Sequence, residues 1–347
     1  MKAIVLDLKE GNPIVEMRDM PVPKIAPDEV LIKVAAVSIC GTDCSIYKYT
    51  PAMQKRIKKF PHILGHEFAG YIKAIGRNIV KWKIGDYVSA ETHIYCGKCP
   101  TCEREDKNLC PNLKLLGVDR DGCFAEYIAV PEKVLIRNDI SLPPYLASIQ
   151  EPLGNAVYCV NKAEVRHKDI LIIGDGPAAL FTAVVAVISK AKSITMLGYN
   201  DYRLQIAEKI GVSSINCVKK RVDFMDEFIG KKDGGWFDVV FEMTGSESGI
   251  NTAINVCRPG GKIMVFGLSE NNSVFVPYNK IALKGIMAQG IYGRNIWKTW
   301  EIAVFFLNHY RNSVEPIITH KLPFNEWQRG FDLMIKSRDC GKVVLLM

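Results

Sequence analysis

The sequence contains no run of about 18 consecutive apolar residues, the length that a membrane-spanning helix needs. Its first residues, MKAIVLDLKEGNP, alternate as a strand does and lack the basic flank and apolar block of an export signal. The net charge is +8, but the lysines and arginines form no concentrated stripe, so a nucleic-acid role is not indicated. These absences favour a cytoplasmic protein whose partners are neither membranes nor nucleic acids.

The cysteine content argues against a further class, the disulfide-stabilised secreted proteins. Eleven cysteines are an odd number in a chain without an export signal, and disulfide frameworks belong to oxidising compartments. Any cluster of these cysteines is therefore better explained by metal binding. The chain has 347 residues, more than one hydrophobic core usually supports, which predicts about two domains.

The hydrophobic pattern changes along the chain. Runs such as EVLIKVAAVSI (29–39) and GCFAEYIAV (122–130) are typical of strands. From DILIIG (169–174) onward, short apolar strands alternate with helical stretches, which predicts a parallel sheet with helices on both faces. We therefore predict an α/β protein with a β-rich domain over residues 1–155, a doubly wound domain over 156–293 and a tail of mixed texture over 294–347.

The sequence GDGPAA (174–179) follows a predicted strand and opens a predicted helix. It matches the G-x-G-x-x-A pattern of the Rossmann fold, in which the first glycine allows a tight turn and the second lets the backbone approach a pyrophosphate. The free N–H groups of the helix N-terminus suit the phosphates. We expect NADP or NAD to bind here. The predicted contacts are Gly174, Gly176, Pro177, Ala178, Gly198, Tyr199, Asn200, Arg203, Gly267, Leu268, Gly290 and Ile291.

The second strand of this domain, SITML (193–197), lacks the acid that commonly binds the ribose 2′-hydroxyl of NAD. Gly198 stands at its tip and leaves room for a 2′-phosphate, and Arg203 is close enough in sequence to contact it. This arrangement favours NADP. The alternative is that Asp201 or Asn200 binds the hydroxyl and Arg203 lies on a helix surface.

Four cysteines lie close together in the stretch CGKCPTCEREDKNLC. Four thiolates fill the tetrahedral shell of zinc and leave no open position, which is typical of a structural site. An iron–sulfur cluster is the rival interpretation, but the strand-rich surroundings and the lack of further cysteines nearby disfavour it. We predict a structural zinc held by Cys96, Cys99, Cys102 and Cys110.

A second set of metal-ligand types is spread along the chain. Cys40 follows a predicted strand, LGHE supplies His66 and Glu67, and QEPLGN supplies Glu151 before the dinucleotide domain. A catalytic zinc has about three protein ligands and an open position. Such an ion polarises a substrate oxygen and would promote hydride transfer to a nicotinamide. We therefore predict a second, catalytic zinc at these four residues.

These motifs together resemble the zinc-dependent medium-chain dehydrogenases. The resemblance rests on CGTD (40–43), GHE (65–67), the cysteine loop (96–110) and GDGP (174–177), and it covers essentially the whole chain. It implies a GroES-like catalytic domain to which the tail, 294–347, returns. It also implies a small-molecule alcohol as substrate and a homodimer or homotetramer.

Within that superfamily, stretches such as SIQEPLGNAV (148–157) are most similar to the L-threonine 3-dehydrogenases. The same resemblance implies that Thr42 begins a proton relay. Those enzymes have Thr-Asp-x-His, whereas Ser45 stands at the histidine position here, and serine cannot become cationic near neutral pH. This departure and Gly198 leave two substrate classes open: threonine, or a polyol or sugar (phosphate) oxidised with NADP. A scaffold that has lost catalysis is disfavoured, because the zinc ligands are present.

Overall fold

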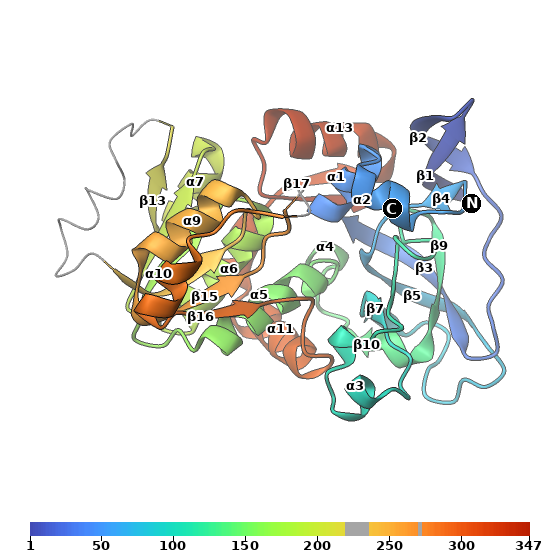
Figure 1. Ribbon diagram of the computed structural model, residues 1–347. Coiled ribbons are helices and arrows are strands. Elements are labelled where there is room, and N and C mark those ends of the chain that lie inside the picture. The colour runs from blue at the N-terminus through green and yellow to red at the C-terminus, as the bar shows by residue number, and fades with distance from the viewer. Residues whose placement is uncertain (219–235, 270–272) are drawn as a thin grey trace. The chain divides into compact units, whose positions relative to one another are not determined.

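The computed structural model describes residues 1–218, 236–269 and 273–347 (Figure 1). Within this part of the chain, no helix is both long and apolar enough to cross a membrane. The contacts divide the chain into two compact units. The first comprises Met1–Pro152, Asn295–Arg311 and Ile318–Met347, and the second comprises Leu153–Arg294 and Asn312–Ile317. The segment Asn312–Ile317, which the sequence analysis assigned to the tail, thus belongs to the second unit.

The second unit is built on a six-stranded sheet of order β13-β12-β11-β14-β15-β16. Every neighbouring pair in it is parallel. Crossovers between parallel strands are right-handed, so the reversal of strand order between β11 and β14 sends the connecting helices to opposite faces. This doubly wound sheet confirms the predicted Rossmann class. Its elements are α5 (Gln150–Ala163), whose first residues up to Pro152 belong to the first unit, β11 (Asp169–Ile173), α6 (Pro177–Ile188), β12 (Ser193–Gly198), α7 (Asp201–Lys209), β13 (Ser213–Asn216), β14 (Phe237–Glu242), α9 (Glu247–Val256), β15 (Cys257–Val265), α10 (Tyr278–Lys284) and β16 (Met287–Gly290).

The local sequence explains why a helix follows the glycine turn at residues 174–176. After Asp169, strand β11 is a continuous buried apolar run, as expected for a parallel strand with both faces covered. Gly176 is the N-cap of α6 and Pro177 is its first residue, where a missing N–H costs nothing. Nearly all of α6 is apolar and buried, so the helix is held against the sheet by packing on several sides.

The first unit contains a seven-stranded sheet in which β10-β6-β5-β3-β18-β17 are neighbours and β9 also pairs with β3. A three-stranded sheet, β2-β1-β4, and the pair β7-β8 complete it. Strand β18 pairs antiparallel with β3, so the C-terminal residues enter the sheet beside the strand that leads to Cys40.

The strands of the first unit are β1 (Lys2–Lys9), β2 (Asn12–Asp19), β3 (Glu29–Ser38), β4 (His62–Ile63), β5 (Glu67–Ile75), β6 (Tyr87–Ala90), β7 (His93–Ile94), β8 (Lys114–Leu115), β9 (Tyr127–Pro131), β10 (Leu135–Arg137), β17 (Ile318–Pro323) and β18 (Lys342–Leu346). Its α-helices are α1 (Gly41–Tyr47), α2 (Pro51–Arg56), α3 (Pro100–Glu103), α4 (Pro144–Ala147), α11 (Lys298–His309) and α13 (Trp327–Asp332). Its shorter helical segments are η1 (Lys107–Leu109), η2 (Glu132–Val134), η4 (Phe324–Glu326) and η5 (Leu333–Ser337). The segments α12 (Arg311–Val314) and η3 (Glu315–Ile317), which belong to the second unit from Asn312 onward, lead into β17.

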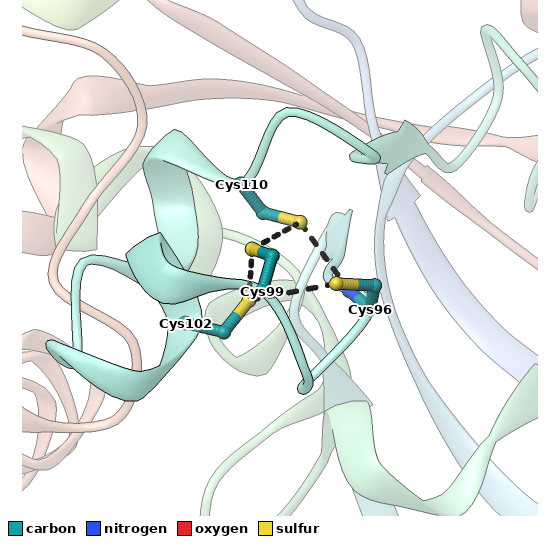
Figure 2. A group of neighbouring side chains, drawn as sticks. All are labelled: Cys96, Cys99, Cys102 and Cys110. Carbon is teal, nitrogen blue, oxygen red and sulfur yellow. Dashed lines mark hydrogen bonds between the residues drawn. The ribbon is translucent and has the colours of Figure 1, made fainter.

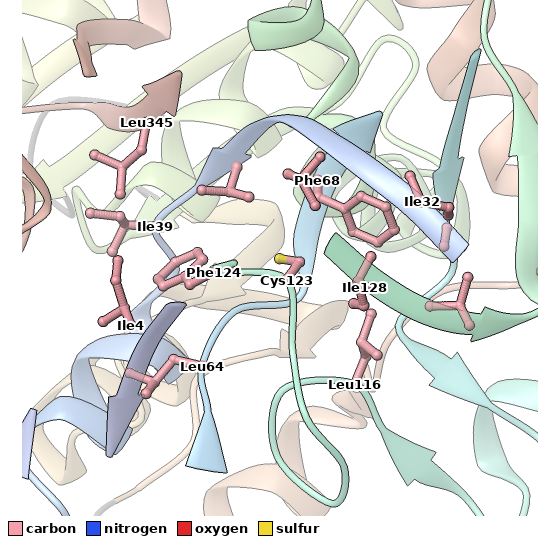
Figure 3. Packing of buried hydrophobic residues seen from close by; sticks show 14 of the residues in the cluster. Ile4, Ile32, Ile39, Leu64, Phe68, Leu116, Cys123, Phe124, Ile128 and Leu345 are labelled. Carbon is pink, nitrogen blue, oxygen red and sulfur yellow. The ribbon is translucent and has the colours of Figure 1, made fainter. Parts of the chain in front are cut away.

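The loop before β5 is fixed by the core of the first unit. Phe124 is fully buried in a cluster with Ile4 and Leu64 (Figure 3). Gly65 has φ +93°, and a Cβ atom on it would lie 2.2 Å from Cδ1 of Phe124. Backbone N–H groups of Cys123 and Phe124 donate to the carbonyls of Gly65 and Leu64 at 2.9 and 2.8 Å. Only glycine fits here, and the fit sets the position of the two residues that follow it.

Replacing Gly65 with alanine is expected to destabilise the protein more than the same change at Gly85. Both glycines have φ +93°, so the backbone strain is matched, but a Cβ on Gly85 meets nothing within 4 Å. Overpacking a core typically costs about 1–3 kcal/mol, which is the difference expected between the two variants. Urea unfolding curves of both variants measure it, and equal losses of stability would contradict the packing argument.

Candidate active site

Three side chains of metal-ligand type meet at the ends of two neighbouring strands. Cys40 follows β3 and precedes α1, whereas His66 directly precedes β5 and Glu67 is its first residue. The two strands are antiparallel, with Ser38 opposite Glu67, so the end of β3 lies beside the start of β5. The ligand atoms of Cys40, His66 and Glu67 all lie within 4.8 Å of one another. The pairing of β3 with β5 therefore brings Cys40 close to His66 and Glu67, which lie 26 and 27 positions later in the sequence.

Asp43, a residue that the sequence analysis did not single out, supports two members of this group. It is fully buried, and its Oδ2 accepts the backbone N–H of Cys40 at 2.8 Å. Its Oδ1 lies 3.3 Å from Nδ1 of His66. Burial lowers the pKa of His66, but the Asp43 carboxylate and the Cys40 sulfur outweigh burial and raise this pKa well above its usual value. The surroundings of the imidazole thus favour a positive charge.

Glu67 is fully buried and lies beside the ammonium group of Lys342, with 2.5 Å between Oε2 and Nζ. The hydroxyl of Ser38 donates to the same oxygen. Burial raises the pKa of Glu67, and Lys342 partly offsets this rise. Burial lowers the pKa of Lys342, but the facing carboxylate outweighs burial and raises it, as expected for an ion pair. The other oxygen, Oε1, is buried and accepts no hydrogen bond from the residues that the structure describes.

This group fits a zinc ion. A thiol, an imidazole and a carboxylate are the usual protein donors to zinc, and three donors leave a position for a substrate oxygen. The buried Oε1 of Glu67 has no hydrogen-bond partner among the described residues, which is costly unless another group satisfies it. A metal ion at this place would use that atom.

The structure does not bring Glu151 into this close group. Its Oε1 lies 3.4 Å from the hydroxyl of Thr92, whose second contact is the carbonyl of His66. The charge of Glu151 is near enough to raise the pKa of Glu67. Glu151 therefore lies beside the group, buried at the start of α5, rather than among its three members.

Thr42, predicted to begin a proton relay, and Ser45, which stands at the position of the relay histidine, lie on the first turns of α1. Thr42 is half-buried and directly follows the helix start. Ser45 is also half-buried, and its hydroxyl donates to the carbonyl of Gly41 at 3.2 Å, a bond within the helix itself. The serine thus has a local partner.

The four clustered cysteines surround one point (Figure 2). The sulfur of Cys99 lies 3.5 Å from that of Cys102 and 3.8 Å from that of Cys110, and the sulfurs of Cys96 and Cys102 are 4.0 Å apart. Thiolates around a tetrahedral zinc, with Zn–S distances of about 2.3 Å, are separated by about 3.8 Å. The backbone N–H of Lys98 lowers the pKa of Cys96 to about 6, which favours the thiolate that binds metal.

A buried carboxylate orients a histidine near the start of this loop. Oε1 of Glu91 accepts the backbone N–H of His93 at 2.8 Å and lies 2.9 Å from its Nδ1. Oε2 of Glu91 accepts the indole N–H of Trp300 at 2.6 Å. All three residues are buried, so the His93 ring is held in a fixed orientation.

In the second unit, the predicted cofactor residues lie at the carboxyl ends of the parallel strands, where such sheets bind ligands. Gly174 has φ +117° and a Cβ on it would lie 3.2 Å from Cγ2 of Thr244. A Cβ on Gly176 would meet nothing within 4 Å, so the start of α6 is open to a phosphate group. Both features fit the expected turn for a pyrophosphate. Pro177 and Ala178 form the first turn of α6.

The remaining predicted contacts follow β15 and β16. A Cβ on Gly267 would lie 2.1 Å from the backbone N of Gly245, so the loops after β14 and β15 touch through glycines. Leu268 is largely exposed. Gly290 ends β16, and the backbone N–H of Ile291 donates to Val265 at 2.9 Å.

The sequence analysis expected Gly198, at the tip of β12, to leave room for a 2′-phosphate, but the structure shows no free space there. The carboxylate of Asp175 fills this space, and a Cβ on Gly198 would lie 2.5 Å from its Oδ2. Arg203 is nearly buried, with Nη1 3.7 Å from Oδ1 of Asp175. Asn200 is the N-cap of α7 and accepts the backbone N–H of Arg203 at 3.1 Å, and Tyr199 is exposed. The sequence-based reason for preferring NADP therefore does not hold.

Two family models match the chain. The Alcohol dehydrogenase GroES-like domain matches residues 26–141, and the Zinc-binding dehydrogenase domain matches residues 178–308. Curated relatives are L-threonine 3-dehydrogenases. That of Bacillus licheniformis is 40% identical over 346 residues, covering 100% of this chain and 99% of the relative. That of Pyrococcus horikoshii is 39% identical over 334 residues, covering 96% and 95%.

Solved structures of the same fold also match over the whole chain. The alcohol dehydrogenase TADH from Thermus sp. ATN1 has a TM-score of 0.89 and 27% identity, covering 100% of this chain and 99% of that chain. Galactitol-1-phosphate dehydrogenase from Escherichia coli has a TM-score of 0.87 and 26% identity, covering 100% of both. The chain belongs to the zinc-dependent alcohol dehydrogenase family and is an NAD(P)-linked oxidoreductase that acts on a CH–OH group.

Proposed function

We propose that the group of Cys40, His66 and Glu67 holds the catalytic zinc. When bound, zinc would supply Lewis acidity toward the substrate oxygen, and a nicotinamide cofactor would provide the hydride acceptor. Asp43 fixes the backbone of Cys40 and the ring of His66, and Lys342 holds one oxygen of Glu67. Glu151 adds negative charge beside the group.

We assign the cluster of Cys96, Cys99, Cys102 and Cys110 to a structural zinc. It has four sulfur donors at tetrahedral spacing and no position for a substrate. Its role is then to stabilise the loop that contains α3 and η1.

The proposed substrate is L-threonine, oxidised at its 3-hydroxyl group to 2-amino-3-oxobutanoate. The observation that carries this proposal is the identity of about 40% to curated L-threonine 3-dehydrogenases over the full length of both chains. The sugar-phosphate enzyme with a similar structure is only 26% identical. A polyol or sugar-phosphate substrate is the alternative that the experiment below separates.

The proton of the substrate hydroxyl needs a route that does not use a relay histidine. We propose that it leaves through the hydroxyl of Thr42, two residues after the metal-binding Cys40, to a ribose hydroxyl or water. The Ser45 hydroxyl is held by the Gly41 carbonyl of its own helix, which argues against its taking the relay role.

The protein is further proposed to act as a homodimer or homotetramer in the cytoplasm. Strand β16 is an edge strand of its sheet, and the exposed Met287 lies on it. Exposed apolar side chains of Phe275, Tyr278 and Leu283 lie on the segment just before it. An edge strand of this kind is suited to pairing with a second copy. Eleven free cysteines suit a reducing compartment.

The substrate proposal is tested by steady-state assays of the zinc-loaded protein. L-Threonine, galactitol 1-phosphate and 2,3-butanediol are compared, each with NAD and with NADP. The highest kcat/KM is expected for L-threonine. Turnover of galactitol 1-phosphate without turnover of threonine would instead establish the polyol-phosphate class.

Replacing Cys40 with serine is expected to lower the zinc content from two ions per chain to one. Activity should fall more than about 100-fold, because even groups that only orient a metal ligand contribute 10–100-fold. The matched control is Cys44→Ser, a half-buried thiol one turn later on α1 that is not in the metal group. Zinc analysis and kinetics measure both variants, and normal turnover of the Cys40 variant would refute a catalytic metal there.

Replacing Cys99 with serine is expected to remove the other zinc and lower the thermal midpoint by several degrees. Metal binding at a closed site contributes directly to folding free energy. Cys217→Ser, at a half-buried thiol outside both clusters, serves as the control. Calorimetry with zinc analysis measures the change, and an unaltered midpoint would show that the cluster does not stabilise the fold.

A further inference from the structure

The turn after β11 carries an acidic residue, Asp175, between the two glycines of the cofactor motif. Its Oδ2 accepts the backbone N–H of Tyr199 at 2.7 Å and that of Asn200 at 2.9 Å. Its Oδ1 lies 3.7 Å from Nη1 of Arg203. The carboxylate therefore reaches from the end of β11 to the turn between β12 and α7.

This carboxylate occupies the place of a side chain that Gly198 lacks. A Cβ built on Gly198 would lie 2.5 Å from Oδ2 of Asp175, 2.7 Å from its Cβ and 2.9 Å from its Cγ. In dinucleotide-binding folds, an acid at the end of the second strand accepts a hydrogen bond from the ribose 2′-hydroxyl of NAD. Asp175 brings the same charge to the same strand tip from the neighbouring turn.

The groups that would bind a 2′-phosphate are already engaged by Asp175. A phosphate at this tip needs backbone N–H groups near the start of a helix and an arginine. The N–H groups of Tyr199 and Asn200 donate to Asp175, and Arg203 faces it. The side chains of Asp175 and Arg203 are only 14% and 8% exposed, so solvent screens their attraction weakly. A phosphate would also meet the like charge of the carboxylate.

We propose that Asp175 determines the cofactor specificity of this protein and that it selects NAD over NADP. A carboxylate offers about four lone-pair positions, and the two N–H bonds use only those of Oδ2. Oδ1 can therefore accept a hydrogen bond from the ribose 2′-hydroxyl. The inference rests on the NAD(P)-linked alcohol oxidation assigned to the chain, and it holds whichever alcohol is the substrate.

Titration of the unmodified protein with NADH and with NADPH tests the proposal without any alcohol. Quenching of tryptophan fluorescence or calorimetry gives the two dissociation constants. NADH is expected to bind about 10–100-fold more tightly, the range expected for a hydrogen bond to a charged group. NADPH binding as tight as NADH binding, or tighter, would overturn the proposal.

The variant Asp175→Asn keeps the size of the side chain and one oxygen acceptor but removes the charge. It should weaken NADH binding and strengthen NADPH binding, so the ratio of the NADPH to the NADH dissociation constant should fall by about tenfold or more. Adding Arg203→Gln should abolish the gain for NADPH, because Arg203 is the cation that Asp175 would otherwise neutralise. The control Asp169→Asn removes the same charge from the opposite end of β11, where Asp169 pairs with Lys192. It should leave the ratio unchanged.

An unchanged ratio in Asp175→Asn would overturn the proposal. If this variant does not fold, the ratio measured for the unmodified protein still decides the question. Failure of the threonine assignment is separate, because a protein that prefers NADH but does not oxidise threonine would support the cofactor inference and refute only the substrate.

Discussion

Burying the carboxylate of Glu67 constrains the whole first unit, because a buried charge must be paired. Lys342 provides the pair from the C-terminal strand β18, and the Ser38 hydroxyl adds a bond from β3. Removing one partner of such a pair typically costs about 3–5 kcal/mol. The last strand of the chain is therefore part of the proposed metal site. The pair also occupies one carboxylate oxygen and leaves the other for the proposed metal ion.

A second buried carboxylate, that of Asp43, has a neighbouring group at each of its oxygens. Asp43 uses one oxygen to fix the backbone of Cys40 and the other to face His66, so one buried carboxylate positions two of the proposed metal donors. The backbone beneath them is held by the contact of Gly65 with Phe124. The donors thus sit on strand ends and a rigid loop, which is how a metal site keeps its geometry. The cysteine cluster is different in kind, because its four ligands come from one short segment.

The carboxylate at the tip of β12 comes from the neighbouring turn after β11 and not from the residues that follow β12. The sequence favoured NADP because no acid stands at the tip of β12, and that inference considered only residues that follow this strand as a source of a carboxylate. The structure shows a carboxylate at this tip that comes from Asp175, beside the first glycine of the motif. The second position of the G-x-G-x-x-A motif accepts many residue types, so the motif alone does not indicate where the side chain of Asp175 points. Arg203, expected at the surface or on a phosphate, faces Asp175 instead.

The sequence alone determined the features that depend on local order. These are the Rossmann alternation, the glycine turn, the spacing of the four cysteines and the identity of Cys40, His66 and Glu67 as possible ligands, because residue type and spacing specify them. Tertiary structure decided what surrounds those residues: Lys342 beside Glu67, Asp43 between Cys40 and His66, Asp175 over Gly198, and Glu151 beside rather than within the close group. Pairing of strands distant in the chain creates these contacts, and no local pattern records which side chains such pairing brings within reach.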